Sequence, residues 1–367
     1  MAERFVSRLF GGPGSDDNPL TSIHGHQCKK RHGHRQREKK LASHLYGQYS
    51  MALVKANARN EDRCQLVSGP LSNLPGGPIG VFVGIYDGHA GNLCSQFVLD
   101  NHFDNLKTAF TNQHGHVNCP VAIVEAYSST EDKFVEHARE NWQQKPKLAS
   151  AGSCCLSAVV HNNVLYVANA GDSRAVLAKW GVGDEDAEEE QLSIDYTTQS
   201  VHRRRELQDV HFDDPDLIKV NNYGIYRVRG CVQVTRAIGD VYLKFNEFNQ
   251  PPLKAQYRQQ QPIVRPILRA DPTGCTRPLG PRDKFVIFGS RGLWRGITND
   301  EAVSLVKASP RSGAARALLI KALDNRARRH NLVYEDLKNQ PLATRQNIHD
   351  DISIVILFFG NLPAENQ

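Results

Sequence analysis

The segment from Val81 to Gly91 joins an apolar run to residues that can hold a cation and move a proton. Residues 81–86 are rich in apolar side chains and lead directly into Asp87-Gly88-His89-Ala90-Gly91. A buried strand that ends at Asp87 would present oxygen ligands, Gly88 would let the backbone approach them closely, and His89 can give or take a proton near neutral pH. An Asp-Gly pair is also typical of a hairpin turn, so this segment gains weight only from other acidic positions.

Further acidic residues occur at the ends of other expected strands. Glu61 and Asp62 lie early in the chain, Asp172 follows the apolar run 164–167, and Asp350-Asp351 precedes the strand-like segment 352–359. Carboxylates gathered from distant strand ends, without a matching set of Cys and His ligands, suit hard divalent cations such as Mg²⁺ or Mn²⁺. Zinc would favour nitrogen and sulfur ligands. The sequence therefore indicates a site for Mg²⁺ or Mn²⁺.

In their order along the chain, these segments resemble the metal-dependent protein serine/threonine phosphatases of type 2C, over residues 48–360. Two longer stretches, residues 82–86 and 152–156, are similar to a plant subgroup of that family. The resemblance implies an α+β fold in which two antiparallel sheets pack face to face with helices outside, an α-β-β-α sandwich. The short motifs that carry it are Glu61-Asp62, Asp87–Gly91, Gly171-Asp172-Ser173-Arg174, Thr235-Arg236-Ala237-Ile238-Gly239-Asp240, Gly292-Leu293-Trp294 and Asp350-Asp351-Ile352-Ser353.

The resemblance also implies roles for the acidic residues around two Mg²⁺ or Mn²⁺ ions. Asp87 would bridge the ions, and the carbonyl of Gly88 would bind one of them. Glu61 and Asp62 would accept hydrogen bonds from metal-bound waters. Asp350 would bind the second ion.

His89 would donate a proton to the departing serine or threonine oxygen. The alternative is a structural histidine that bonds to a backbone carbonyl. Asp172 either reaches a loosely held third ion or belongs to a Gly-Asp-Ser turn. Asp240 is expected to act as a structural hydrogen-bond acceptor, and Asp351 stands where the family often has asparagine.

Two positions depart from the family pattern. Asn57 stands where the family has its phosphate-binding arginine, and Arg59 could replace it only from the opposite face of an extended segment. Arg291 stands where the family has an aspartate that binds the second metal, and Arg295 occupies a position that is often acidic. One unit charge about 5 Å from a dication costs on the order of 6 kcal/mol at an effective dielectric constant of 20.

Three outcomes are open at Arg291. The second metal is lost, or the side chain swings away and the site works poorly, or the guanidinium takes the vacated cation position and pairs with Asp87 and Asp350. The leading hypothesis is a protein serine/threonine phosphatase that acts on phosphorylated proteins. The alternative is a pseudophosphatase that binds phosphoproteins without hydrolysis.

Composition is ordinary for a globular protein: 23% of the 367 residues are charged and 40% are apolar. No run approaches the ~20 apolar residues of a membrane span, and the first ten residues lack an apolar signal-peptide core. Eight cysteines occur without a Cys-x-x-Cys pair, which favours a reduced setting in the cytoplasm or nucleus. We expect a monomer.

Charge and composition divide the chain into a flexible basic and His-rich arm (residues 1–44), a phosphatase-like domain (45–361) and a tail (362–367). The arm holds much of the net charge of +6, in a run from Lys29 to Lys40. Such a run is typical of a solvated arm, although it could also bind nucleic acid or anionic lipid or act as a nuclear address. Nucleic acid is not an expected partner. We expect an acidic loop at 183–190, a mobile flap at 195–230 and a basic amphipathic helix at 311–331.

Overall fold

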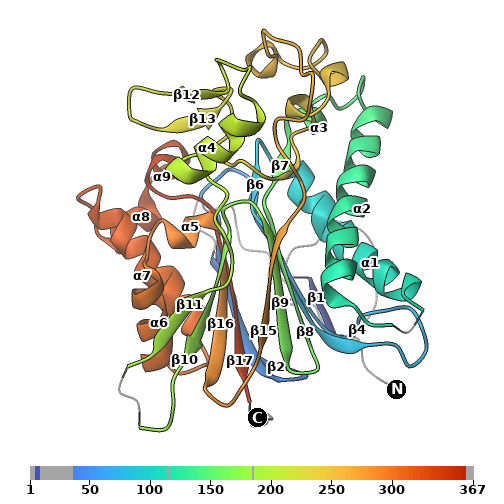
Figure 1. The fold of residues 1–367 in the computed structure, drawn as a ribbon. Coiled ribbons are helices and arrows are strands. Elements are labelled where there is room, and N and C mark those ends of the chain that lie inside the picture. Colours follow the sequence, from blue (N-terminus) through green and yellow to red (C-terminus); the bar gives the residue numbers. More distant parts are fainter. Residues whose placement is uncertain (1–4, 9–35, 115, 184–185, 361–367) are drawn as a thin grey trace.

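The computed structural model describes residues 5–8, 36–114, 116–183 and 186–360, and these form two antiparallel sheets packed face to face with helices on both outer sides (Figure 1). This α-β-β-α sandwich confirms the fold class expected from the sequence. The first sheet has the order β1 (Phe5–Arg8), β4 (Arg63–Pro70), β5 (Ile79–Tyr86), β8 (Cys155–His161), β9 (Val164–Ala170) and β15 (Thr273–Pro278). The second has the order β11 (Glu188–Gln191), β10 (Arg174–Lys179), β16 (Asp283–Gly289), β17 (Ile352–Phe359), β3 (Gly47–Val54) and β2 (Gln36–His44).

Strand β17 shows why the sequences of the central strands are nearly unbroken runs of apolar residues. Successive side chains of a strand point to opposite faces of its sheet. Val355 and Leu357 belong to the core between the two sheets, whereas Ile354 and Ile356 pack with the helices outside the second sheet. Both faces of β17 are therefore covered, and all eight of its residues are buried.

Two long helices, α1 (Leu93–Asn112) and α2 (Cys119–Glu140), cover the outer face of the first sheet. Their buried apolar positions follow the helical period. Tyr127 of α2 locks this layer to the sheet, because its buried hydroxyl lies 2.8 Å from the carbonyl oxygen of Cys155 and 2.9 Å from that of Ala168.

Helices α6 (Asn299–Ala308) and α7 (Ala314–Arg328) cover the second sheet. Helix α6 begins at a capping box in which Thr298 and Glu301 satisfy each other's backbone N–H groups. Helix α7 is the basic helix expected within residues 311–331. Three short helices lie near its C-terminal end: α5 (Arg291–Trp294), α8 (Tyr334–Asn339) and α9 (Leu342–Ile348).

A small third sheet joins three distant segments at the end of the sandwich. Its order is β14 (Ile238–Gly239), β7 (Gly152–Ser153) and β6 (Gly88–His89). Beyond it, residues 195–270 form an upper layer in Figure 1. This layer contains helix α4 (Val201–Val210), strands β12 (Ile218–Val220) and β13 (Tyr226–Val228), and the short 3₁₀ turns at 241–243, 246–248 and 255–257. The four-residue helix α3 (Lys147–Ser150) contacts the turn at 241–243.

The acidic run differs from its expected state, because residues 188–191 form strand β11 rather than a loop. Neighbouring cations offset its repulsion: Lys179 Nζ lies 3.2 Å from Glu190, and Arg282 lies 3.0 Å from Glu188. Residues 184 and 185 lie outside the described residues.

The N-terminal segment also contains strands that its composition did not indicate. Residues 5–8 pair with β4, and residues 36–44, which we expected within the flexible arm, form the edge strand β2 against β3. An edge strand carries polar and charged side chains on its open side, so its apolar signal is weak. Most of the basic and His-rich run, residues 9–35, and the tail at 362–367 lie outside the described residues. No described helix is long and apolar enough to cross a bilayer.

Candidate active site

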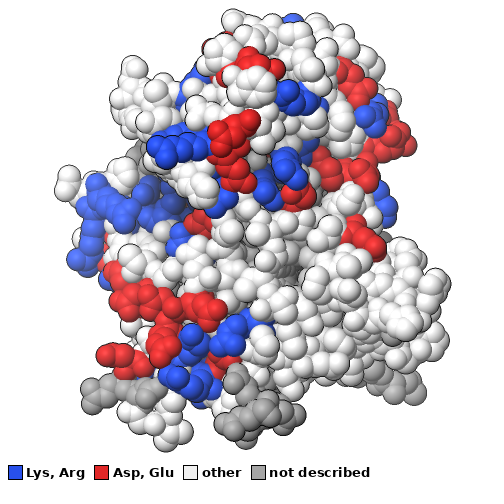
Figure 2. Space-filling view, in the orientation of Figure 1, with Lys and Arg blue, Asp and Glu red and all other residues white. Residues whose placement is uncertain are grey.

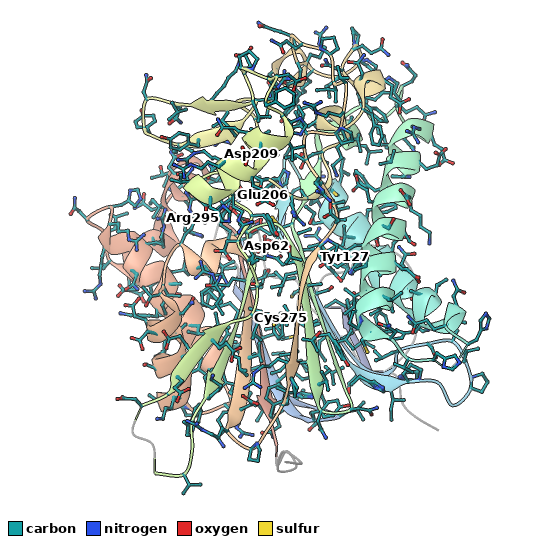
Figure 3. All side chains as sticks on the ribbon, viewed as in Figure 1. Asp62, Tyr127, Glu206, Asp209, Cys275 and Arg295 are labelled. Atoms are coloured by element: carbon teal, nitrogen blue, oxygen red, sulfur yellow. The ribbon has the colours of Figure 1, made fainter. Side chains whose placement is uncertain are left out.

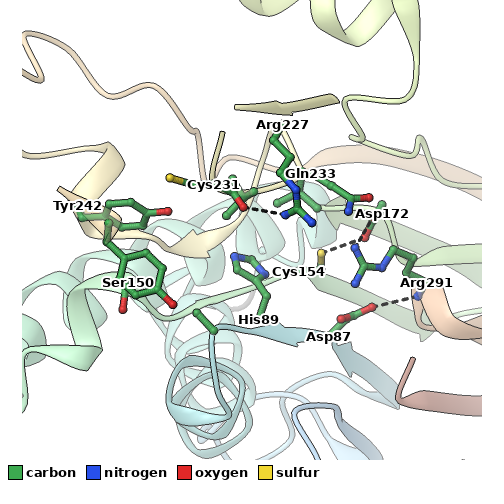
Figure 4. Close-up of a pocket in the computed structure, with 14 residues that line it drawn as sticks. Asp87, His89, Ser150, Cys154, Asp172, Arg227, Cys231, Gln233, Tyr242 and Arg291 are labelled. Atoms are coloured by element: carbon green, nitrogen blue, oxygen red, sulfur yellow. Dashed lines mark hydrogen bonds and ion pairs between the residues drawn. The ribbon is translucent and has the colours of Figure 1, made fainter. Parts of the chain in front are cut away.

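The acidic segments expected to meet do so at one end of the sandwich (Figure 3, where Asp62 marks this end). Asp87 follows β5, Asp172 lies in the turn between β9 and β10, Arg291 opens α5 after β16, and Asp350 precedes β17. A pocket of about 250 Å³ opens at this end, shown in Figure 4. Its lining includes Asp87, His89, Asp172, Arg227 and Arg291.

His89 forms a hydrogen-bonded ion pair across the small sheet. Its Nε2 lies 2.7 Å from Oδ2 of Asp240, a carboxylate that is fully buried. Burial alone would lower the pKa of His89, but the Asp240 carboxylate outweighs it and the pKa is raised. The partner of Nε2 is therefore a carboxylate, rather than the backbone carbonyl of the structural alternative. The imidazole is favoured in its proton-carrying form while facing the pocket.

Gly152 makes this pair possible. It lies in β7, between the strand that carries His89 and the strand that precedes Asp240. A Cβ atom at residue 152 would collide with both Nε2 of His89 and Oδ2 of Asp240. Any larger residue would push the imidazole and the carboxylate apart.

The carboxyl groups of Glu61, Asp62 and Asp87 all have raised pKa values. Burial, reinforced by Asp351 and Asp350, raises the pKa of Glu61 to about 7. Burial and the neighbouring Asp87 raise the pKa of Asp62. Burial also raises the pKa of Asp87 to about 7, although Arg291 opposes the shift. A cation bound among these carboxyl groups would lower their pKa values and favour their ionised forms.

Asp351 fixes the loop that carries Glu61. One of its carboxylate oxygens accepts backbone N–H groups from Ala56 at 2.6 Å and Asn57 at 3.0 Å, and the other accepts that of Glu61 at 2.6 Å. The side-chain oxygen of Asn57 accepts a hydrogen bond from Gln346 of α9 at 3.0 Å. Asp351 thus has a positioning role that the sequence did not reveal.

The guanidinium of Arg291 lies among the acidic groups. Its Nη2 is 2.6 Å from Oδ2 of Asp350, and its Nη1 is 3.9 Å from Oδ2 of Asp172. The backbone N–H of Arg291 donates to Oδ2 of Asp87 at 3.0 Å. Burial raises the pKa of Asp350, but the guanidinium overcomes this and holds the pKa below its ordinary value. Of the three outcomes left open, this geometry matches the one in which the guanidinium takes a cation's place, with Asp350 as its main partner and Asp87 held only through the backbone.

The residues around Asp87 fit a divalent cation. Oδ2 of Asp62 is buried without a hydrogen-bond partner, so a water bound to an ion could satisfy it. A Cβ at Gly88 would collide with the carbonyl of Glu61 and with Ser95, so only glycine lets the backbone pass this close. No group of three or more His, Cys, Asp or Glu side chains in the described part of the chain could hold an ion by itself. A site here would therefore rely on Asp87, a backbone carbonyl and water.

The position beside Asp350 does not fit a second cation, because the Arg291 guanidinium fills it. Arg59, the possible substitute for the family's phosphate-binding arginine, is exposed and does not line the pocket. Arg227 of β13 does line it, and its Nη1 donates to the carbonyl of Cys231 at 2.8 Å. Nothing in the sequence distinguished Arg227 from the other arginines of its charged segment.

Comparison with known proteins identifies the family of the chain. Residues 52–331 match the family model described as "Protein phosphatase 2C". The chain is 42% identical to "Probable protein phosphatase 2C 46" of Arabidopsis thaliana over 320 residues, which cover 87% of this chain and 84% of that protein. It is 41% identical to "Probable protein phosphatase 2C 72" of Oryza sativa subsp. japonica over 315 residues, with 86% and 79% covered.

A solved structure shares the fold. The serine-threonine phosphatase 2C from Toxoplasma gondii superposes with a TM-score of 0.62 at 18% identity, covering 89% of this chain and 99% of that one. The chain therefore belongs to the protein phosphatase 2C family and resembles its plant members.

Proposed function

We propose that this chain is a metal-dependent protein serine/threonine phosphatase that binds one catalytic cation, beside Asp87. The observation that carries the proposal is the pairing of His89 with Asp240 in the same pocket as Asp87. This pocket combines a group that holds a proton with a carboxylate at the end of a buried strand. The names of the plant relatives, all protein phosphatases, support the same activity.

The acidic residues would hold and orient the cation. Asp87 and the Gly88 carbonyl would bind Mg²⁺ or Mn²⁺, while Glu61 and Asp62 would accept hydrogen bonds from its waters. When bound, such an ion lowers the pKa of water to supply a nucleophile and neutralises phosphoryl oxygens. The crowded carboxylates, which burial keeps partly protonated, would then ionise.

His89 would protonate the departing serine or threonine oxygen. The Asp240 carboxylate keeps the proton on the imidazole and fixes the direction of the ring, as the short Nε2–Oδ2 contact of 2.7 Å indicates. We propose that the substrates are phosphorylated proteins and that the chain acts as a monomer inside the cell. The seven described cysteines are all free, which suits a reducing compartment.

One observation favours a second candidate, a pseudophosphatase that binds phosphoproteins without hydrolysing them. The Arg291–Asp350 ion pair closes the position where a second cation would complete two-metal catalysis. A phosphate group could still enter the pocket beside Asp87 and meet Arg227.

A phosphopeptide assay separates the two candidates. The phosphatase predicts Mn²⁺-dependent release of phosphate that is lost in Asp87→Asn. If the chain is a pseudophosphatase, the natural chain should bind the same phosphopeptide without releasing phosphate, and Asp87→Asn should likewise release none. A chain that neither binds nor hydrolyses phosphopeptides would contradict both.

A further inference from the structure

Three arginines form a basic surface next to the active site, and the proposed function does not use them. Arg295 follows α5, Arg326 lies in the last turn of α7, and Arg329 follows that helix. We call these three residues the arginine cluster. Figure 2 shows Lys and Arg gathered on this side of the molecule, and Figure 3 places Arg295 at the same end of the sandwich as Asp62.

The cluster is fastened to the two segments that carry the Arg291–Asp350 ion pair. Nη1 of Arg329 donates to the backbone carbonyl of Arg295 at 2.9 Å, and the backbone N–H of Arg295 donates to the carbonyl of Arg291 at 3.0 Å. Nε of Arg326 donates to the carbonyl of Ile348, two residues before Asp350, at 3.0 Å. The cluster is thus held at a fixed place beside the pocket.

In the described part of the chain, none of these arginines has a carboxylate within ion-pair distance. Nor does the guanidinium of Arg295 make a hydrogen bond within that part of the chain. Arg326 and Arg329 each donate one guanidinium N–H to a backbone carbonyl, whereas a guanidinium offers five N–H groups. Burial lowers the pKa of Arg326, and the positive charges of Arg295 and Arg329 lower it further, although the Asp350 carboxylate opposes the shift. Like charges held together in this way are relieved by an anion.

Neighbouring arginines show that the lack of partners is not general in this region. Arg328 lies between Arg326 and Arg329 in sequence but pairs with Asp324 of its own helix at 2.8 Å. Residues three apart on a helix share a face, so Arg326 and Arg329 point to the same side and Arg328 to another. The two arginines without carboxylate partners are the two that face α5 and the start of β17.

We propose that the arginine cluster binds an anionic side chain, carboxylate or phosphate, that flanks the target phosphoresidue in a protein substrate. The inference rests on the proposed function, because it assumes that a phosphoresidue occupies the pocket beside Asp87. Arginine suits this task, since its planar guanidinium binds carboxylate and phosphate through paired hydrogen bonds. The cluster would select substrates in which the target site lies within an acidic or multiply phosphorylated segment.

The test compares three phosphoserine peptides of equal length by fluorescence anisotropy in the presence of Mn²⁺. One has neutral residues on both sides of the phosphoserine, one has glutamates there, and one has further phosphoserines. The natural chain should bind both anionic peptides about tenfold more tightly than the neutral one, a typical size for a charge-assisted contact. Raising the salt concentration should reduce that preference. A preference for one anionic peptide alone would identify which anion the cluster binds.

Arg295→Gln is the main variant, because, among the described residues, the guanidinium of Arg295 makes no hydrogen bond or ion pair whose loss would disturb the fold. It should lose most of the preference and keep the affinity for the neutral peptide, and adding Arg326→Gln and Arg329→Gln should abolish the preference. Arg328→Gln is the matched control: it removes the same charge from α7, the helix that carries Arg326, and should change nothing. An undiminished preference in Arg295→Gln and in the triple variant, or an equal loss in Arg328→Gln, would overturn the inference. If the natural chain binds no phosphopeptide at all, the proposed function fails as well.

Discussion

The guanidinium of Arg291 lies 2.6 Å from the carboxylate of Asp350, and residue 291 is the position where the family resemblance implies a metal-binding aspartate. The side chains are only partly exposed, at 23% and 27%, so water screens the pair weakly. A positive side chain thereby stands where an acidic one would help to hold a cation. The Arg291 guanidinium offsets the charge of Asp350 without a second ion, so the pKa of Asp350 is lowered. The pKa values of Glu61, Asp62 and Asp87 remain raised.

The first prediction concerns the cation position at Asp87. Asp87→Asn keeps the size of the side chain but removes its charge, so Mn²⁺ binding measured by calorimetry should be lost or weakened at least tenfold. Asp283→Asn supplies the control, because Asp283 is equally buried but lies at the start of β16, far from the site. An unchanged Mn²⁺ isotherm in Asp87→Asn would remove Asp87 from the site.

The second prediction concerns the proton on His89. Asp240→Asn removes the charge that raises the pKa of His89, so burial should then dominate and the pKa should fall below that of the natural chain. Nuclear magnetic resonance titration of the imidazole measures this directly. In turnover assays, the loss of rate at rising pH should begin at a lower pH in the variant. An imidazole that titrates identically in both proteins would show that Asp240 does not hold the proton.

A third prediction tests the glycine that allows this pair. Gly152→Ala should displace His89 from Asp240 and reduce turnover at least tenfold, because the added methyl group needs the space of both side chains. Gly274→Ala is a suitable control, since a Cβ at that strand position meets only an ordinary contact with the carbonyl of Val167. Equal activity in the two variants would contradict the assigned geometry.

A fourth prediction concerns stability and pH, away from the cation site. His102 of α1 is buried against the rings of Phe82, Tyr86 and Tyr127, and burial lowers its pKa to about 3. As pH falls below about 6.5, His102 of the unfolded chain therefore binds a proton, whereas His102 of the folded chain stays neutral until about pH 3. The free energy of unfolding should fall as pH drops from about 6.5 towards 3, by up to about 1.4 kcal/mol per pH unit from this one group.

Denaturant unfolding at several pH values measures the slope. In His102→Gln the slope should lessen by about one proton, because glutamine can still bond to Thr130 without titrating. A slope that is the same with and without His102 would mean that other groups cause the acid sensitivity.

The sequence predicted those features that depend on local pattern or on short motifs. The run into Asp87, the two helices over the first sheet and the acidic segments all follow from residue order and periodicity. Their convergence at one end of the sandwich was available only through the family resemblance, because strand pairing joins segments that are far apart. The pairing of His89 with Asp240 spans 151 residues, and no local signal marks Gly152 as the position between them.

Other features were hidden because their sequence signals point elsewhere. Strand β2 is rich in polar and charged residues, so the sequence alone placed it in the flexible arm. The glutamates of β11 read as a repelling loop until the cations of β10 and the 281–283 turn are seen beside them. Arg291 was recognised as a departure, but its choice of Asp350 as partner depends on how α5 is seated between β16 and β17.

Restoring the acidic residue should change turnover as well as binding. Arg291→Asp returns a carboxylate beside Asp350 and removes a cation, so phosphopeptide hydrolysis should rise by an order of magnitude or more. If it does not, adding Arg295→Glu separates two explanations. Recovery in the double variant would show that Arg295 also disables the site, whereas no recovery would mean that residue 291 is not at the second cation position.

The most direct test is to count Mn²⁺ ions bound per chain at saturation in the natural protein, Arg291→Asp and Arg291→Gln. Two-metal catalysis needs two carboxylate-lined positions, so the expected counts are about one, about two and about one. Arg291→Gln removes the guanidinium without adding a ligand, which separates loss of repulsion from gain of a carboxylate. Two ions in the natural protein, or a single ion in Arg291→Asp, would contradict the account in which the Arg291 guanidinium holds the second cation's place.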